Sequence, residues 1–203
     1  AFSGSIGFDS STGRFIRQPI FGVGYAGLSV LLFLDVNANE TYEPDVDVML
    51  PYAAVRIPNH PKPELGKDGV LRFMRLPQHR VLEIEIIPSK LPDPFLLPAK
   101  PNYQIHTRTN RYQELHIPFY YGGWVEGEVM IMKPAENDPV AGAGLKLLLW
   151  RLESPEEVRM IPTFRDGTFY VDGLLPGTYR IKPDENQTEA LQLMTSDSWI
   201  EFE

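Results

Sequence analysis

Two copies of one pattern constrain the fold of this 203-residue chain more than any other feature. In each copy an Asp-Gly turn opens a short alternating strand, a Leu-Pro turn follows, and a second alternating strand comes next. The first copy runs from Asp68 to Ile86 and the second from Asp166 to Ile181. Such self-similarity defines the repeating unit of a fold. A period of about a hundred residues is too long for a solenoid and fits two tandem β-sandwiches.

The strand patterns extend this prediction to the whole chain. With 19 prolines, 16 glycines and almost no helical periodicity, the composition is typical of an all-β protein. Residues 27–34 are apolar on both faces, which favours a central strand. Residues 82–86 alternate apolar side chains with carboxylates, which indicates a half-buried antiparallel strand. A single helical turn is expected near 154–157, with Ser154 as its cap.

We therefore expect three parts. An N-terminal β-hairpin, or the tail of a preceding domain, occupies residues 1–24. Two antiparallel sandwiches follow, the first over 25–118 and the second over 119–203. A chain that begins at Ala1 rather than Met suggests a processed protein or an excised fragment, which we expect to be monomeric.

Charge and composition exclude several classes of function. The net charge of −8, with no clustered basic patch, argues against nucleic acid as a partner. No stretch approaches the roughly 18 consecutive apolar residues of a membrane helix. The chain has no cysteine, so neither disulfides nor thiolate metal sites are available. No zinc-type histidine spacing and no nucleophile elbow occurs, and the paired acids Glu83 and Glu85 point out of a strand. The sequence predicts no catalytic residues.

The acidic loop that follows the first central strand is a candidate calcium site. Oxygen ligands at alternate positions of a short loop are how proteins wrap a hard cation such as Ca²⁺. Glu40 stands where the sharp turn of such a loop prefers glycine, and Val46 stands where a bidentate Glu is expected. The alternative is an Asx-rich turn whose side chains bind their own backbone without metal. The candidate ligands are Asp35, Asn37, Asn39, Thr41, Glu43, Asp45 and Asp47.

Aromatic residues gather where the two sandwiches are expected to join. Tyr120, Tyr121 and Trp124 could stack on a sugar ring or anchor a protein partner. The interpretation that we favour is that they form the contact that fixes one sandwich against the other. Both interpretations stay open at the level of sequence.

Two segments carry a family resemblance. Residues 33–45 are similar to the F-x-D-x-N-x-N-G opening of SdrD B-like modules. Residues 166–169 with 175–179 resemble the D-G-x-F and L-P-P-G-x-Y ending shared by Cna B-type and carboxypeptidase regulatory-like modules. Each unit thus looks like a prealbumin-like (Ig-like) sandwich of a bacterial surface protein. The whole arrangement resembles the sandwich-rich ends of outer-membrane-associated proteins of Bacteroidetes-type bacteria.

The resemblance implies a function and a place in the cell. It implies a non-enzymatic, extracytoplasmic structural or adhesion segment, located at the cell surface or in the periplasm, that acts as a rigid spacer or presents its loops. Its partners would be other domains of the same polypeptide or envelope proteins. The alternatives are a glycan- or peptide-binding module and an accessory domain of an outer-membrane transporter or peptidase.

Overall fold

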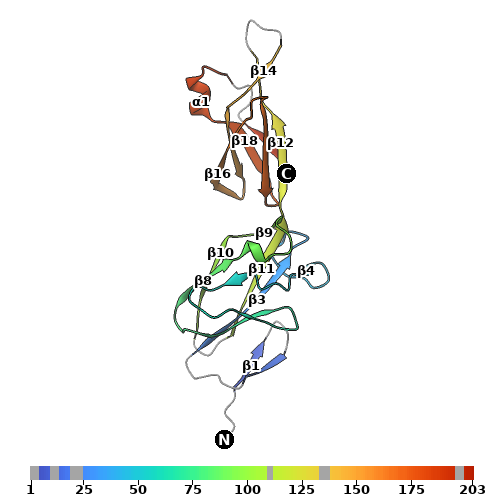
Figure 1. Ribbon diagram of the computed structural model, residues 1–203, viewed down its shortest axis with the longest axis vertical. Coiled ribbons are helices and arrows are strands. Elements are labelled where there is room, and N and C mark those ends of the chain that lie inside the picture. Colours follow the sequence, from blue (N-terminus) through green and yellow to red (C-terminus); the bar gives the residue numbers. More distant parts are fainter. Residues whose placement is uncertain (1–4, 10–13, 19–24, 109–111, 133–137, 195–198) are drawn as a thin grey trace. The chain divides into compact units, whose positions relative to one another are not determined.

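The computed structural model describes residues 5–9, 14–18, 25–108, 112–132, 138–194 and 199–203. The chain is nearly all β and divides into two compact units, Ala1–Tyr121 (unit 1) and Gly122–Glu203 (unit 2) (Figure 1). The division falls three residues after the sequence-based boundary at 118.

Unit 1 contains a hairpin and two facing sheets. The hairpin pairs β1 (Ser5–Asp9) with β2 (Arg14–Gln18), as expected for this end of the chain. The larger sheet has the order β6-β7-β3-β11-β9, with β4 (Val48–Met49) also pairing with β3, and the smaller has the order β10-β8-β5. The larger sheet consists of β6 (Glu64–Leu65), β7 (Leu71–Leu76), β3 (Ala26–Leu34), β11 (Tyr112–Tyr121) and β9 (Leu96–Pro98). The smaller sheet consists of β10 (Asn102–His106), β8 (Val81–Ile86) and β5 (Val55–Arg56), and a 3₁₀ turn, η1, spans Pro88–Lys90.

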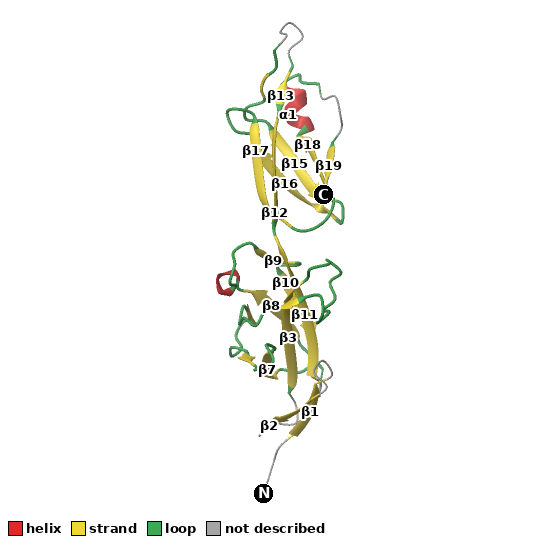
Figure 2. Ribbon diagram, turned by 90° about the vertical axis from the view of Figure 1, so that its right-hand side faces the viewer, coloured by secondary structure: helices red, strands yellow, loops and turns green. Residues whose placement is uncertain are grey.

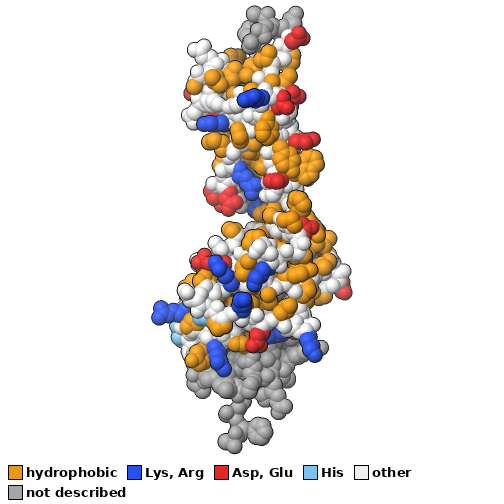
Figure 3. Space-filling model, in the orientation of Figure 1, with side chains coloured by type: hydrophobic (Ala, Val, Ile, Leu, Met, Phe, Trp, Pro, Cys, Tyr) orange, Lys and Arg blue, Asp and Glu red, His pale blue; other side chains and the backbone are white. Residues whose placement is uncertain are grey.

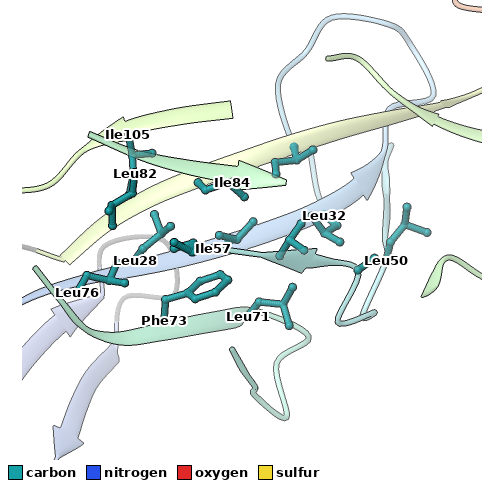
Figure 4. Packing of buried hydrophobic residues seen from close by; sticks show 14 of the residues in the cluster. Leu28, Leu32, Leu50, Ile57, Leu71, Phe73, Leu76, Leu82, Ile84 and Ile105 are labelled. Atoms are coloured by element: carbon teal, nitrogen blue, oxygen red, sulfur yellow. The ribbon is translucent and has the colours of Figure 1, made fainter. Parts of the chain in front are cut away.

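Strand β3 is the centre of unit 1. It is buried along its length up to Phe33, as its two apolar faces predict. Leu28 and Leu32 point into the space between the sheets, where Leu82 and Ile84 of β8 meet them (Figure 4). On the opposite face, Leu31 and Phe33 form a second cluster with Val70, Tyr42 and Met49.

The strands of unit 1 depart from the antiparallel expectation at one place. β3 and β11 run parallel, with Gly27–Leu34 beside Tyr112–Phe119. All other described strand pairs are antiparallel. Parallel neighbours need a long crossover between them. Here the chain from β4 to β10 forms the crossover, and β11 then returns to pair with β3.

Unit 2 contains a four-stranded sheet, β16-β15-β18-β19, and two two-stranded sheets, β12-β17 and β13-β14 (Figure 2). Its core is a cluster of six buried residues: Leu147, Leu149, Ile161, Leu174, Tyr179 and Ile181. The strands are β12 (Gly123–Glu128), β13 (Met130–Ile131), β14 (Val140–Ala141), β15 (Lys146–Arg151), β16 (Ser154–Pro162), β17 (Thr168–Leu174), β18 (Tyr179–Pro183) and β19 (Ile200–Phe202).

The repeated sequence pattern has the same local structure in both units. Its two alternating strands are β7 and β8 in unit 1, and β17 and β18 in unit 2. Each Asp-Gly turn places its glycine in the left-handed region, with φ of 77° at Gly69 and 83° at Gly167. Each aspartate accepts a hydrogen bond from the backbone N–H two residues on, at Val70 and at Thr168. Glycine is required because other residues reach this region only with strain.

The helix expectation was wrong in position. Residues 154–157 begin strand β16 instead. Ser154 pairs with Arg151 of β15, and after a register shift the pairing resumes at Arg159 opposite Leu149. The helix of unit 2 is instead α1 (Glu185–Ala190), where the Asp184 side chain accepts a hydrogen bond from the Asn186 N–H. A capping aspartate followed by Glu185 in the first turn was the available signal.

Candidate functional site

The acidic loop begins at a buried carboxylate. Asp35 is only 4% exposed. Its Oδ1 accepts a hydrogen bond from the Asn39 N–H (3.3 Å), and its Oδ2 accepts from the Glu40 N–H (2.7 Å). The Tyr120 hydroxyl also donates to Asp35 Oδ2, at 3.0 Å. A buried carboxylate is tolerated only when hydrogen bonds replace its lost water, and Asp35 has three such donors.

The loop ends at a second buried carboxylate. Asp47 is 7% exposed. Its Oδ1 accepts from the Val36 N–H (3.1 Å) and its Oδ2 from the Glu43 N–H (2.7 Å). Together the two aspartates bind four backbone N–H groups of the loop. Charge-assisted bonds of this kind are stronger than neutral ones, so they fix the loop's path.

The exposed side of the loop is also linked internally. The Asn37 and Asn39 amides both donate to Glu43 Oε2, at 2.7 and 2.8 Å. Asn39 Oδ1 accepts from the Thr41 N–H at 2.7 Å. Glu40 adopts a left-handed φ of 58°, the position where glycine is preferred. This conformation costs about 1 kcal/mol, which the hydrogen bond to Asp35 helps to offset.

The loop has a packing role. Tyr42 contacts the ring of Phe33 edge-on, with centroids 5.4 Å apart, and also meets His116 of β11 at 6.2 Å. The loop therefore lays an aromatic ring over the face of β3 that the smaller sheet does not cover.

The calcium site stays a prediction. In the part of the chain that the structure describes, no three His, Cys, Asp or Glu side chains come together as a metal cluster. Oxygens of Asp35, Asn39, Glu43 and Asp47 accept N–H donors of the same loop. Calcium binding would have to recruit their remaining lone pairs, together with Asn37, Thr41 and Asp45.

The three junction aromatics have different environments. Tyr120 is only 7% exposed, so it belongs to the interior of unit 1, where a partner cannot reach its ring. Tyr121, the last residue of unit 1, is 57% exposed, and Trp124 of unit 2 is 61% exposed. Sequence reasoning grouped these residues because they are adjacent, but strand alternation turns neighbouring side chains to opposite faces.

Trp124 forms a surface with residues that sequence analysis did not single out. Its ring stacks on Tyr170 of β17, with centroids 6.1 Å apart and planes at 27°. Pairing sets Trp124 opposite Asp172 and Glu126 opposite Tyr170, so these four side chains share one exposed face. Along the right-hand side of unit 2 in Figure 3, acidic and hydrophobic side chains lie next to one another. Finding the Trp124–Tyr170 pair from the sequence would have required knowledge of the register between β12 and β17.

The perturbed ionisable groups lie in structural positions. Hydrogen bonds from Arg72 lower the pKa of Asp68 to about 2, in the turn before β7. A hydrogen bond from the Thr168 hydroxyl lowers the pKa of Asp166 in the equivalent turn of unit 2. Burial, together with the Asp35 carboxylate, raises the pKa of Tyr120 well above its ordinary value. Each shift is explained by a contact that holds the fold.

Comparison with known proteins gives only distant structural likenesses. No family model and no curated protein matches the sequence. The TIE protein of Bacillus anthracis is 13% identical with a TM-score of 0.31, covering 94% of this chain and 34% of its own. The minor pilin of Streptococcus agalactiae is 9% identical with a TM-score of 0.39, covering 87% and 89%. A streptococcal ancillary pilin is 12% identical with a TM-score of 0.39, covering 92% and 60%.

These sequence identities and TM-scores are too low to assign a function from the matched proteins. The fold assignment rests on the strand pairing of this chain. This chain spans about a third of the length of the TIE protein. Among the described residues, no helix is both long and apolar enough to cross a membrane.

The Tyr120–Asp35 hydrogen bond predicts a dependence of stability on alkaline pH. The folded state raises the pKa of Tyr120. The hydrogen bond therefore makes its full contribution to the free energy of unfolding below the unfolded pKa of about 10, and this contribution is lost as the pH rises above that value. Tyr120→Phe should lower the free energy of unfolding by about 1 kcal/mol at pH 8. Between pH 9 and 11, the free energy of unfolding should fall less for this variant than for the wild type. Urea denaturation at each pH, followed by circular dichroism, measures the free energy of unfolding of both proteins. An equal fall for the variant and the wild type between pH 9 and 11 would contradict the prediction.

The calcium prediction is tested at the exposed side of the loop. Millimolar Ca²⁺ should raise the melting temperature of the wild type relative to EDTA. Glu43→Gln should abolish that rise, because it removes a ligand charge but keeps both buried aspartates. Glu64→Gln, exposed and outside the loop, is the matched control and should keep the rise. Identical wild-type melts with Ca²⁺ and with EDTA would exclude the site.

Proposed function

We propose that this chain is a non-enzymatic structural or adhesion segment of an extracytoplasmic surface protein, serving as a rigid spacer or a partner-presenting module. One observation carries the proposal. Strand β11 ends at Tyr121 and strand β12 begins at Gly123, so Gly122 alone separates the last strand of unit 1 from the first strand of unit 2. A connection this short lacks the Gly/Ser run of a flexible linker.

The chemistry of the polar residues supports this proposal. The buried aspartates Asp35 and Asp47 bind backbone N–H groups, and the turn aspartates Asp68 and Asp166 do the same. Glu85 pairs with Arg56 on a strand surface. A catalytic carboxylate needs a cleft and a pKa matched to its task. The hydrogen bonds and the ion pair of these acids are made within the fold, which supports a structural role. The expected partners are other domains of the same polypeptide or envelope proteins.

The spacer is tested by the distribution of distances between the units. Since the chain has no cysteine, Lys62→Cys with Glu157→Cys gives two unique dye positions, both at exposed residues of different units. Single-molecule energy transfer should show one narrow distribution. Inserting Gly-Ser-Gly-Ser after Gly122 should broaden it. A wild-type distribution as broad as that of the insertion variant would refute the rigid spacer.

A second candidate function is recognition of a glycan. The stacked rings of Trp124 and Tyr170 offer an apolar platform beside the carboxylates of Glu126 and Asp172. Aromatic faces stack on sugar rings and carboxylates accept hydroxyl hydrogen bonds. This surface replaces the Tyr120-Tyr121-Trp124 grouping that the sequence suggested.

The glycan surface is tested by a panel of glycans presented to the wild type and to two variants. Binding should be lost, at least tenfold in affinity, in Trp124→Ala and in Tyr170→Ala. Tyr121→Ala removes an equally exposed aromatic outside the stacked pair and should bind as the wild type does. Binding that survives both ring deletions, or no binding to any glycan by the wild type, would reject the candidate.

A further inference from the structure

Five strands of each unit are paired in the same way. In unit 1, β3 pairs with β7 in one sheet, and β5, β8 and β10 form the other. In unit 2, β12 pairs with β17, and β15, β18 and β19 form the facing sheet in the corresponding order. All of these pairs are antiparallel in both units. The repeated sequence pattern anchors the match, since it lies on β7–β8 and on β17–β18.

The strand that pairs with the second edge of β3 has no described counterpart beside β12. In unit 1, β3 has β7 on one edge and the parallel strand β11 on the other. In unit 2, β12 pairs with β17, and no other described strand pairs with its second edge. The backbone groups along that edge of β12 are therefore without a ladder partner among the described strands. Figure 1 draws β12 along one side of unit 2.

The apolar side chains of unit 2 show the same gap. In unit 1, Leu28, Val30 and Leu32 of β3 are 0%, 0% and 1% exposed. Strand β11 completes that core with Ile117 and Phe119, both 0% exposed. In unit 2, Val125 of β12 and Phe169 and Val171 of β17 are only partly buried at the rim of a smaller cluster. Ile117 and Phe119 of β11 have no counterpart among the described strands of unit 2, because none of those strands pairs with the second edge of β12.

We propose that the second edge of β12 is a receptor for one further β-strand, which lies parallel to β12 and comes from outside residues 1–203. Addition of a strand to an open edge satisfies the backbone through a ladder and gains specificity from alternate side chains. The occupant carries apolar side chains at alternate positions, as β11 does where Leu115 and Ile117 stand beside Val30 and Leu32. Its other side chains are polar and face water.

The proposal is independent of the spacer and of the glycan surface. Strand addition uses the backbone edge and the inward face of β12, where Val125 points. The glycan candidate uses the outward face, where Trp124 and Tyr170 stack. Trp124→Ala should therefore leave strand addition intact while removing any glycan binding, so failure of one idea is distinguishable from failure of the other.

The test uses a synthetic peptide with the sequence of residues 112–121 as the probe and the full 203-residue protein as the receptor. A control peptide carries Ser in place of Leu115, Ile117 and Phe119. Hydrogen exchange of residues 123–128 should slow at least tenfold with the first peptide and not with the second. The melting transition of unit 2 should rise in parallel. Tryptophan fluorescence follows it selectively, because all three tryptophans, at 124, 150 and 199, lie in unit 2.

Three results would overturn the proposal. Amides of β12 that exchange as slowly as those of β3 in the protein alone would mean that the edge is already covered. Equal exchange with and without the first peptide would mean that the edge does not accept a strand of this chemistry. Slowing of exchange at β12 with rising protein concentration, accompanied by dimer formation in sedimentation, would mean that a second copy of the chain is the occupant.

Discussion

Burial of strand β3 on both faces is the constraint on which unit 1 depends. A strand that is apolar on both sides is stable only if two layers cover it. The smaller sheet supplies one layer through Leu82 and Ile84. The acidic loop supplies the other by placing Tyr42 over Phe33. The parallel strand β11 then closes the last open edge of β3. Sheet, loop and closing strand are all consequences of one apolar segment.

The acidic loop shows how charge can serve packing. Burying Asp35 and Asp47 would be unfavourable by several kcal/mol if they lacked partners. They instead bind the N–H groups of Val36, Asn39, Glu40 and Glu43, which would themselves be costly to bury unpaired. Each group satisfies the other, so the loop keeps a fixed path without a regular ladder. Tyr120 extends this network from β11 into the loop and links the closing strand to it.

The two units share strand pairings but differ in how much apolar surface they bury. Unit 1 buries a large cluster between its sheets, while the core cluster of unit 2 has six buried residues and further apolar side chains are only partly buried. In unit 1, β11 contributes two fully buried side chains, and no described strand takes the corresponding place beside β12. A spacer whose second unit accepts a strand would join its neighbour through backbone pairing. Such a junction is continuous with the sheet and needs no separate interface.

The sequence alone determined the β class, the duplicated unit and the central position of β3, because these follow from local turn chemistry and side-chain alternation. The Asp-Gly turns at Asp68 and Asp166 are local interactions, and both formed as their residues dictate.

Contacts between residues that are far apart in the sequence were decided only by the tertiary structure. Strand β16 formed over residues 154–162 because β15 lay beside it, and Trp124 met Tyr170 because register set them diagonally. The hydrogen bond from Tyr120 to Asp35 joins residues 85 positions apart. Parallel pairing of β3 with β11 likewise depends on where the chain returns after two sheets. Only the folded chain decides such contacts, since no local pattern encodes which distant strand arrives at an edge.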